Sequence, residues 1–284
     1  MSIPTLVEEQ REGIKGRLIS TVIIISSVLI MISHELYNRT TREQWPFFNV
    51  SIMLVVLLYL VLRLREERLS DRKIKIGGRE IYTDNLVLLL LLALPFLAYF
   101  YPGGSSYARW VIFNFLTLLL LTWAVIAGIL GENLKRFGFQ LGDIKTGAKF
   151  ILVLFLLVLP VFIFGARRAE FKSYYPFYPE ARTNIWIFLY YAFVLRAIYM
   201  LVWEFFFRGY ITFGLFPAFG YWVILIQTIP FGIMHIGKPI LEVYGSFFTG
   251  VVLGYVAIKS KSFVPCFILH WLSAVVFDIL VMIL

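Results

Sequence analysis

The sequence has one cysteine and few charged residues, and both shortages limit what the protein can be. A single cysteine, Cys266, excludes an internal disulfide framework and any metal site built from several cysteines. Charged residues make up only 15% of the 284 residues, whereas 60% are hydrophobic and the mean hydropathy is +0.84. This leaves too little polar surface for a soluble domain, so the composition predicts a polytopic helical membrane protein.

Acidic residues are fewer than basic ones, and the excess of lysine and arginine gives a net charge of +9. We interpret this charge as a signal of membrane topology and of attraction to anionic lipid head groups. The basic residues form no clustered stripe with interleaved aromatic residues, so no nucleic-acid partner is expected. The lipid bilayer is the partner that the composition predicts.

Long apolar runs recur along the chain and define the expected fold class. We predict an all-α, polytopic transmembrane helical bundle with eight or nine spans. One run is too long for a single straight crossing, and Arg196 within it is expected to mark a bend or an interfacial start. The runs lie at about Leu18–Ser33, Phe47–Leu62, Asn85–Tyr101, Trp110–Leu130, Phe150–Phe164, Ile185–Phe216, Tyr221–His235, Leu241–Ile258 and Phe263–Leu284.

Basic residues also orient the spans. The segment Arg63–Asp84 carries seven lysine and arginine residues and a Gly77-Gly78 turn, so we expect a cytoplasmic loop there. With alternating spans the amino terminus is cytoplasmic too, held by a retained signal anchor in the plasma membrane. A second loop, rich in aromatic residues and proline, is expected at Arg167–Thr183. We divide the chain into residues 1–149, with N-terminal transmembrane helices and basic loops, and residues 150–284.

The most informative segment is Trp203–Gly209, where Glu204 and Arg208 stand four residues apart inside an apolar run. At this spacing both side chains lie on one face of a helix. Ionisable groups in a bilayer cost at least ~2.5 kcal/mol each, so they persist where they pair, face a protein interior or do chemistry. An isolated pair of this kind would most simply neutralise itself within a bundle.

Two of the three histidines lie in the next apolar runs. His235 is followed by Gly237, which can end one helix, and by Pro239, which can begin another. Such a break would bring Glu242, in the first turn of the next helix, close to His235, and broken helices in membranes generally line a cavity. His270 alone would be a hydrogen-bonded core histidine. Together these residues predict a polar site inside the membrane.

The order of these motifs resembles the CAAX prenyl protease and bacteriocin-processing (CPBP, ABI) family of intramembrane proteases. Its members typically show Glu-Glu-x-x-x-Arg, Phe-x-x-x-His and His-x-x-x-Asn segments on successive helices. The resemblance covers about Asn184–Leu284, and Phe137–Asp143 looks like the segment that commonly precedes this domain. It identifies residues 150–284 as a CAAX-protease-like domain with its motifs in 203–274. The matching residues are Glu204, Arg208, Gly209, Phe231, His235 and His270.

The resemblance implies an endopeptidase that hydrolyses a peptide bond of a membrane-associated peptide or protein with an activated water. No serine or cysteine stands in an evident nucleophile context. The base would be Glu204 or, through the helix break, Glu242, with His235 sharing the water. His270 would orient the water or stabilise the oxyanion.

The same resemblance implies further roles. Arg208 would hold Glu204 or Asp278 in place, and Asp278 and Lys238 are secondary candidates. Glu204, His235 and His270 also form a recognised zinc set with an open fourth position, although no His-Glu-x-x-His motif is present. The sequence leaves a metal-free glutamate mechanism and a zinc mechanism open.

Two positions depart from the family pattern. Trp203 stands where the first glutamate is expected, and Ala274 replaces the asparagine expected four residues after His270. These departures favour an alternative, a catalytically inactive family member that binds a membrane peptide or a lipid-linked ligand. A transporter would share buried charge and broken helices, but the sequence has no paired repeats with breaks at corresponding positions.

Overall fold

The structure, a computed structural model, describes residues 73–76, 79–82 and 107–284. Within these residues, five helical segments are long and apolar enough to cross a membrane, as expected for a polytopic helical protein. The three runs predicted before Tyr107 lie outside the described residues, so the total of eight or nine spans and the cytoplasmic amino terminus stay predictions. The five segments are Tyr107–Ile129, Ile144–Ala166, Ile185–Ile233, Ile240–Ser260 and Val264–Ile283.

A short antiparallel hairpin precedes the described helices, within the segment where we expected a loop. Strand β1 (Lys73–Ile76) pairs with β2 (Arg79–Tyr82), with Lys73 opposite Tyr82 and Ile76 opposite Arg79. The signal for it is present in the sequence, because two short runs separated by two glycines favour a tight hairpin. The membrane-spanning part of the described chain is helical throughout.

Helices of ordinary α form alternate with short π-helical turns (η2, η3, η6 and η7) and 3₁₀ turns (η4, η5 and η8). The predicted loop Arg167–Thr183 contains the short helix α7 and the turn η5. In chain order the elements are α4 (Tyr107–Asn114), η2 (Phe115–Leu120), α5 (Leu121–Ala124), η3 (Val125–Ile129), η4 (Leu134–Phe137), α6 (Ile144–Ala166), α7 (Ala169–Tyr174), η5 (Pro179–Arg182), α8 (Ile185–Tyr190), η6 (Tyr191–Leu195), α9 (Arg196–Glu204), η7 (Phe205–Ile211), α10 (Thr212–Phe219), η8 (Gly220–Trp222), α11 (Val223–Ile233), α12 (Ile240–Ser260) and α13 (Val264–Ile283).

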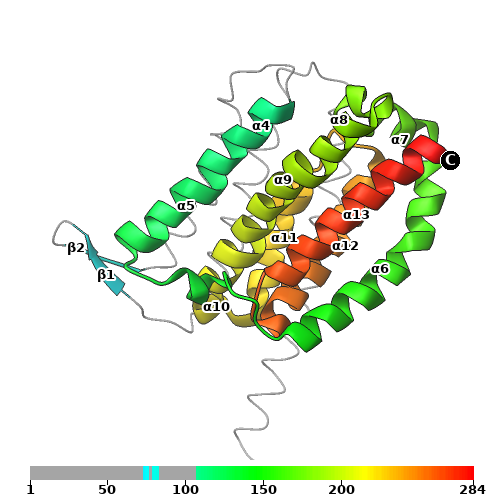
Figure 1. The fold of residues 1–284 in the computed structure, drawn as a ribbon. Coiled ribbons are helices and arrows are strands. Elements are labelled where there is room, and N and C mark those ends of the chain that lie inside the picture. The colour runs from blue at the N-terminus through cyan, green and yellow to red at the C-terminus, as the bar shows by residue number, and fades with distance from the viewer. Residues whose placement is uncertain (1–72, 77–78, 83–106) are drawn as a thin grey trace, which may run out of the picture.

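Helix α6 lies along α13 at one edge of the bundle (Figure 1). Its N-cap is Asp143, whose carboxylate accepts hydrogen bonds from the backbone N–H of Thr146 at 3.0 Å and from the Thr146 hydroxyl at 2.7 Å. These bonds favour the charged form and lower the pKa of Asp143 below its usual value. Leu152, Leu156 and Val161 on α6 are 58–63% exposed, as expected for a lipid-facing helix.

The segment from α8 to α10 is continuous and helical, and its π-helical turns lie beside the polar residues. Arg196 begins α9 directly after η6, and Arg208 lies within η7. Such π-helical turns are rare and are frequently found at functional sites. The sequence predicted a bend or an interfacial start at Arg196, but this residue is helical, 2% exposed and inside the bundle. After α10 the chain turns at Gly220, which has a φ of +53°, and α11 packs back against α10 and η7.

The predicted helix break after His235 is present. Helix α11 ends at Ile233, Gly237 adopts a φ of +95°, and Pro239 caps the start of α12. A positive φ favours glycine, which has no Cβ to collide with the backbone. The break places the turn that carries His235 next to the first residues of α12.

Helices α11 and α12 approach closely through glycine. A Cβ added at Gly250 would lie 2.8 Å from Cγ2 of Thr228, and the carbonyl of Gly250 accepts a hydrogen bond from Gln227 at 2.8 Å. Small residues at such positions let helices in membranes pack backbone to backbone. Gly245, on the same helix, has no atom within 4 Å of an added Cβ.

These two glycines give a matched test of the helix packing. We expect Gly250→Val to lower the free energy of unfolding in detergent by about 1–3 kcal/mol, because the added methyl groups overlap Thr228. Gly245→Ala should leave it unchanged or raise it by up to about 1 kcal/mol through better helix propensity. Thermal unfolding of both variants measures the difference, and equal stabilities would contradict the packing of α11 against α12.

Candidate active site

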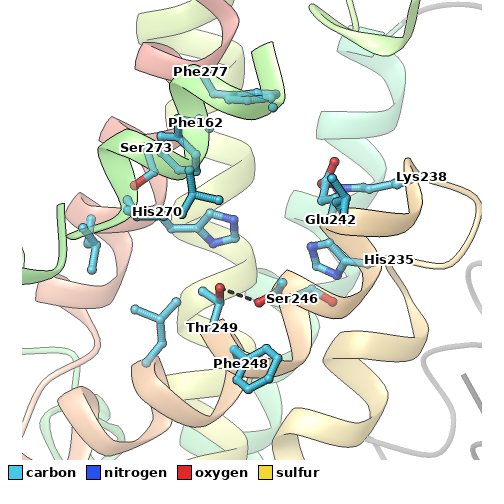
Figure 2. Close-up of a pocket in the computed structure, with 18 of the residues that line it drawn as sticks. Phe162, His235, Lys238, Glu242, Ser246, Phe248, Thr249, His270, Ser273 and Phe277 are labelled. Carbon is cyan, nitrogen blue, oxygen red and sulfur yellow. Dashed lines mark hydrogen bonds and ion pairs between the residues drawn. The ribbon is translucent and has the colours of Figure 1, made fainter. Parts of the chain in front are cut away.

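A cavity of about 450 Å³ lies among α6, α12 and α13, and most of its lining is apolar (Figure 2). Phe164 of α6 and Phe248 of α12 border it and are 60% and 74% exposed, so the cavity is open toward the lipid-facing side of the bundle. A small number of polar groups in an apolar pocket is typical of a ligand site. Polar side chains in the lining are Tyr175, Arg196, His235, Lys238, Glu242, Ser246, Thr249, His270 and Ser273.

The pair predicted from the four-residue spacing forms, and it includes a histidine. Oε1 of Glu204 lies 3.1 Å from Nη1 of Arg208 and 2.6 Å from Nδ1 of His270. The Glu204 and Arg208 side chains are fully buried, whereas the His270 side chain is 19% exposed and borders the cavity. The carboxylate accepts, so Nδ1 of His270 donates and Nε2 remains available to a ligand.

The polar atoms of the Glu204–Arg208 pair behind His270 have only some of their hydrogen bonds. Oε2 of Glu204 and both Nε and Nη2 of Arg208 are buried and have no hydrogen-bond partner among the described residues. The Arg208 guanidinium compensates in part by lying 3.9 Å from the ring centroid of Phe231. Buried polar atoms without partners are uncommon and call for a functional reason or an ordered water.

His235 is held in a definite orientation by the end of α11. Its Nδ1 lies 2.7 Å from the carbonyl oxygen of Phe231, and its ring lies 4.6 Å from the Phe231 ring. A carbonyl oxygen only accepts, so Nδ1 carries the proton, and Nε2 of the neutral ring is an acceptor. His235 and His270 lie on facing walls of the cavity (Figure 2).

Glu242 shares the cavity with His235, as the helix break predicts, but its bonds run to other residues. Both carboxylate oxygens accept from the Tyr175 hydroxyl at 2.6 Å, and Oε1 lies 2.7 Å from Nζ of Lys238. Burial and the nearby carboxylate raise the pKa of Tyr175 well above its ordinary value. The hydroxyl therefore stays protonated and donates to Glu242.

Asp278, which the sequence analysis gave as an alternative to Glu204 as the partner of Arg208, belongs to a different ion pair. Its Oδ2 lies 3.0 Å from Nη2 of Arg196 and accepts a hydrogen bond from the Tyr191 hydroxyl at 3.1 Å. Sequence reasoning missed Arg196 as a site residue. A signal for it existed, because a second arginine in a long apolar run also needs a partner, and Asp278 is the one acidic residue within α13.

The zinc hypothesis requires three ligand atoms that converge on one ion at about 2.0–2.2 Å. Instead, Oε1 of Glu204 already bonds to the His270 ring and to the Arg208 guanidinium. No group of three or more His, Cys, Asp or Glu side chains in the described ranges is arranged to hold a metal ion. This geometry does not fit zinc, and we derive no step through a metal.

The buried pair yields a stability prediction. Glu204→Gln leaves the Arg208 charge buried without a counter-ion, so the free energy of unfolding should fall by about 3–5 kcal/mol. Glu170→Gln, which breaks the exposed pair with Arg168 at 2.8 Å, should change it by less than about 1 kcal/mol. Thermal unfolding in detergent measures both, and a small effect at Glu204 would contradict the buried ion pair.

Comparison with known proteins gives one result that bears on this site. Residues 181–276 match the family model described as Rce1-like, type II CAAX prenyl endopeptidase Rce1-like. The matched region contains the Glu204, Arg208, His235, Glu242 and His270 positions. The comparisons with curated proteins and with solved structures gave no match. The match confirms the resemblance seen in the sequence: residues 181–276 are similar to the Rce1-like type II CAAX prenyl endopeptidases.

Proposed function

We propose that this protein is an intramembrane endopeptidase that hydrolyses a peptide bond in a membrane-associated substrate. One observation carries the proposal: Glu204 bonds to His270 at 2.6 Å, and His270 faces His235 across a largely apolar cavity. An imidazole oriented by a buried carboxylate is the arrangement that makes histidine an effective general base. The family of residues 181–276 supports the same reaction class.

In the proposed mechanism a water lies between the two imidazoles. Each hydrogen of the water is donated to one Nε2 atom, because the Nδ1 protons of His235 and His270 are committed to Phe231 and Glu204. The free lone pair of the water then points at the scissile carbonyl. As the oxygen attacks the carbonyl carbon, one proton passes to Nε2 of His270, and this imidazolium later protonates the leaving amine.

Glu204 acts behind His270 in this scheme. It is fully buried and lies outside the cavity lining, so its role is to fix the His270 tautomer and stabilise the imidazolium. Arg208 holds the Glu204 carboxylate in place through the 3.1 Å contact. Glu242 is the less suitable base, because Tyr175 and Lys238 already occupy its carboxylate oxygens.

Ala274 borders the cavity and offers no donor to the oxyanion. The imidazolium at His270 supplies positive charge close to the same position. Removing one oxyanion donor typically lowers the rate by ~10² to 10³, so this difference slows the reaction without abolishing it. Trp203 packs in the core against Phe207 at 5.3 Å and lies outside the cavity lining, so it leaves the facing histidines accessible.

The proposed substrate carries an apolar or lipid-modified segment. The cavity walls are mainly Leu, Val and Phe side chains from α6 and α12, which favour a hydrocarbon over a charged peptide. The description of the matched family names a prenyl endopeptidase, so a peptide with a prenylated C-terminal cysteine is the first substrate to test.

Cleavage of prenylated and unmodified forms of one peptide by detergent-purified protein tests the proposal. His270→Gln and His235→Gln should each lower kcat/KM by at least about 10²-fold, because each replaces the imidazole Nε2 that orients the attacking water with an amide that cannot serve as a base. Glu242→Gln should lower it by less than about 10-fold. Product masses and rates, measured with and without a chelator, report the outcome.

Several results would overturn this assignment. A larger loss in Glu242→Gln than in His270→Gln would make Glu242 the base. Inhibition by the chelator, reversed by added zinc, would contradict the metal-free scheme. A folded wild-type protein that binds the prenylated peptide without cleaving it would instead support a binding role.

A second prediction tests the cavity itself. Gly245 borders the cavity, and an added Cβ there meets no atom within 4 Å, so Gly245→Trp fills the cavity without disturbing the helix packing. We expect peptide cleavage to fall at least about 10-fold while the melting temperature stays within a few degrees. Gly245→Ala is the matched control and should keep wild-type activity. Normal cleavage by the tryptophan variant would place the substrate elsewhere.

A further inference from the structure

We propose that Arg196 and Asp278 are positioning residues that fix the register of α9 against α13 and so hold Glu204 at His270. The inference rests on the proposed function for its kinetic consequence, but its structural part stands alone. Neither residue belongs to the Glu204–His270 contact. Their effect would pass along the two helices that carry that contact.

The two polar contacts between α9 and α13 share one antiparallel register. Arg196 lies eight residues before Glu204 on α9, and its partner Asp278 lies eight residues after His270 on α13. The helices lie side by side along this length (Figure 1). Two bridges about 12 Å apart along the helix axis define both where the helices meet and how they are rotated. One bridge alone would leave the helices free to tilt about it.

The Arg196–Asp278 bridge is built to be rigid. The side chains are 2% and 0% exposed, and the guanidinium is enclosed by aromatic rings at 4.8 to 5.6 Å. The Tyr191 hydroxyl donates to the same Asp278 oxygen that Arg196 contacts. The enclosing rings are those of Tyr175, Phe177 and Tyr191. Burial and the surrounding rings restrict this charged pair to one geometry, although Arg196 also borders the cavity.

The Glu204–His270 hydrogen bond needs such a bridge because a small displacement of α9 would break it. A shift of α9 by one residue moves Glu204 by about 1.5 Å, which turns a 2.6 Å hydrogen bond into a separation beyond hydrogen-bond range. General-base catalysis depends on that bond, because it fixes the His270 tautomer. Loss of the bridge should therefore lower kcat and leave substrate binding largely intact.

The test removes the bridge without leaving a buried charge. The double variant Arg196→Gln/Asp278→Asn replaces both charged side chains with uncharged amides. The single variant Tyr191→Phe deletes only the hydroxyl that orients Asp278. We expect kcat of the cleavage reaction to fall at least 10-fold in the double variant and about 3-fold in Tyr191→Phe, with KM within 2-fold of wild type. Arg168→Gln/Glu170→Gln, the same change at an exposed ion pair, is the control and should leave kcat unchanged.

A second readout follows the register directly and needs no activity. Met200 and Ala274 lie midway between the two bridges, each four residues from one member of either pair, and both border the cavity. Met200→Cys/Ala274→Cys, in a Cys266→Ala background that removes the chain's own thiol, should form a disulfide on mild oxidation. Adding Arg196→Gln/Asp278→Asn should lower the yield at least 3-fold.

The outcomes separate this inference from the proposed function. Normal disulfide yield and normal kcat in the folded double variant would overturn it, and so would a rise in KM at constant kcat, which would indicate direct contact with substrate. If the double variant does not fold, unchanged kcat and disulfide yield in Tyr191→Phe would overturn it. If wild type cleaves no peptide, the proposed function fails, and the disulfide yield alone decides the role of Arg196 and Asp278.

Discussion

The burial of charge inside an apolar bundle is the constraint on which this site depends. Four charged side chains are removed from solvent: Glu204, Arg208, Arg196 and Asp278. A buried charge that loses its partner lowers the stability of the fold by more free energy than the intact pair contributes. The helices must therefore meet where the charges meet, which fixes α9 against α13. His270 is then delivered to Glu204 as a consequence of the same fit. The polar contacts thus specify an arrangement that apolar packing alone would leave less defined.

Features that depend on neighbouring residues could be predicted from the sequence. The Glu204–Arg208 contact follows from helical spacing, and the break before Pro239 follows from the conformational preferences of glycine and proline. Contacts between segments far apart in the sequence could not be predicted. The sequence analysis expected Arg196 at a bend or an interfacial start and left Asp278 as an alternative partner of Arg208, because nothing local shows which helix faces which. The hairpin from Lys73 to Tyr82 was missed although its two glycines gave a local signal.

The two departures from the family pattern lie in different surroundings. Trp203 is packed into the aromatic core around Phe207 and Phe231, where its ring replaces a carboxylate with hydrophobic contacts. Ala274 instead borders the cavity and leaves space where an amide is expected. The side chain at position 203 therefore belongs to the hydrophobic core and not to the cavity wall. The second leaves only a methyl group at that point of the cavity wall, next to Ser273.

The lipid-facing opening of the cavity beside Phe164 and Phe248 has a consequence for the kinetics of any ligand. A molecule that enters there first dissolves in the bilayer and then reaches the site by diffusion in two dimensions. The concentration that governs binding is then the number of ligand molecules per unit area of membrane. Hydrophobic molecules reach a higher concentration there than in water, because they partition into the bilayer. Diluting the protein with lipid would slow encounter at constant bulk concentration. A water-soluble peptide would reach the site only at the low membrane concentration that its cost of entering the bilayer allows.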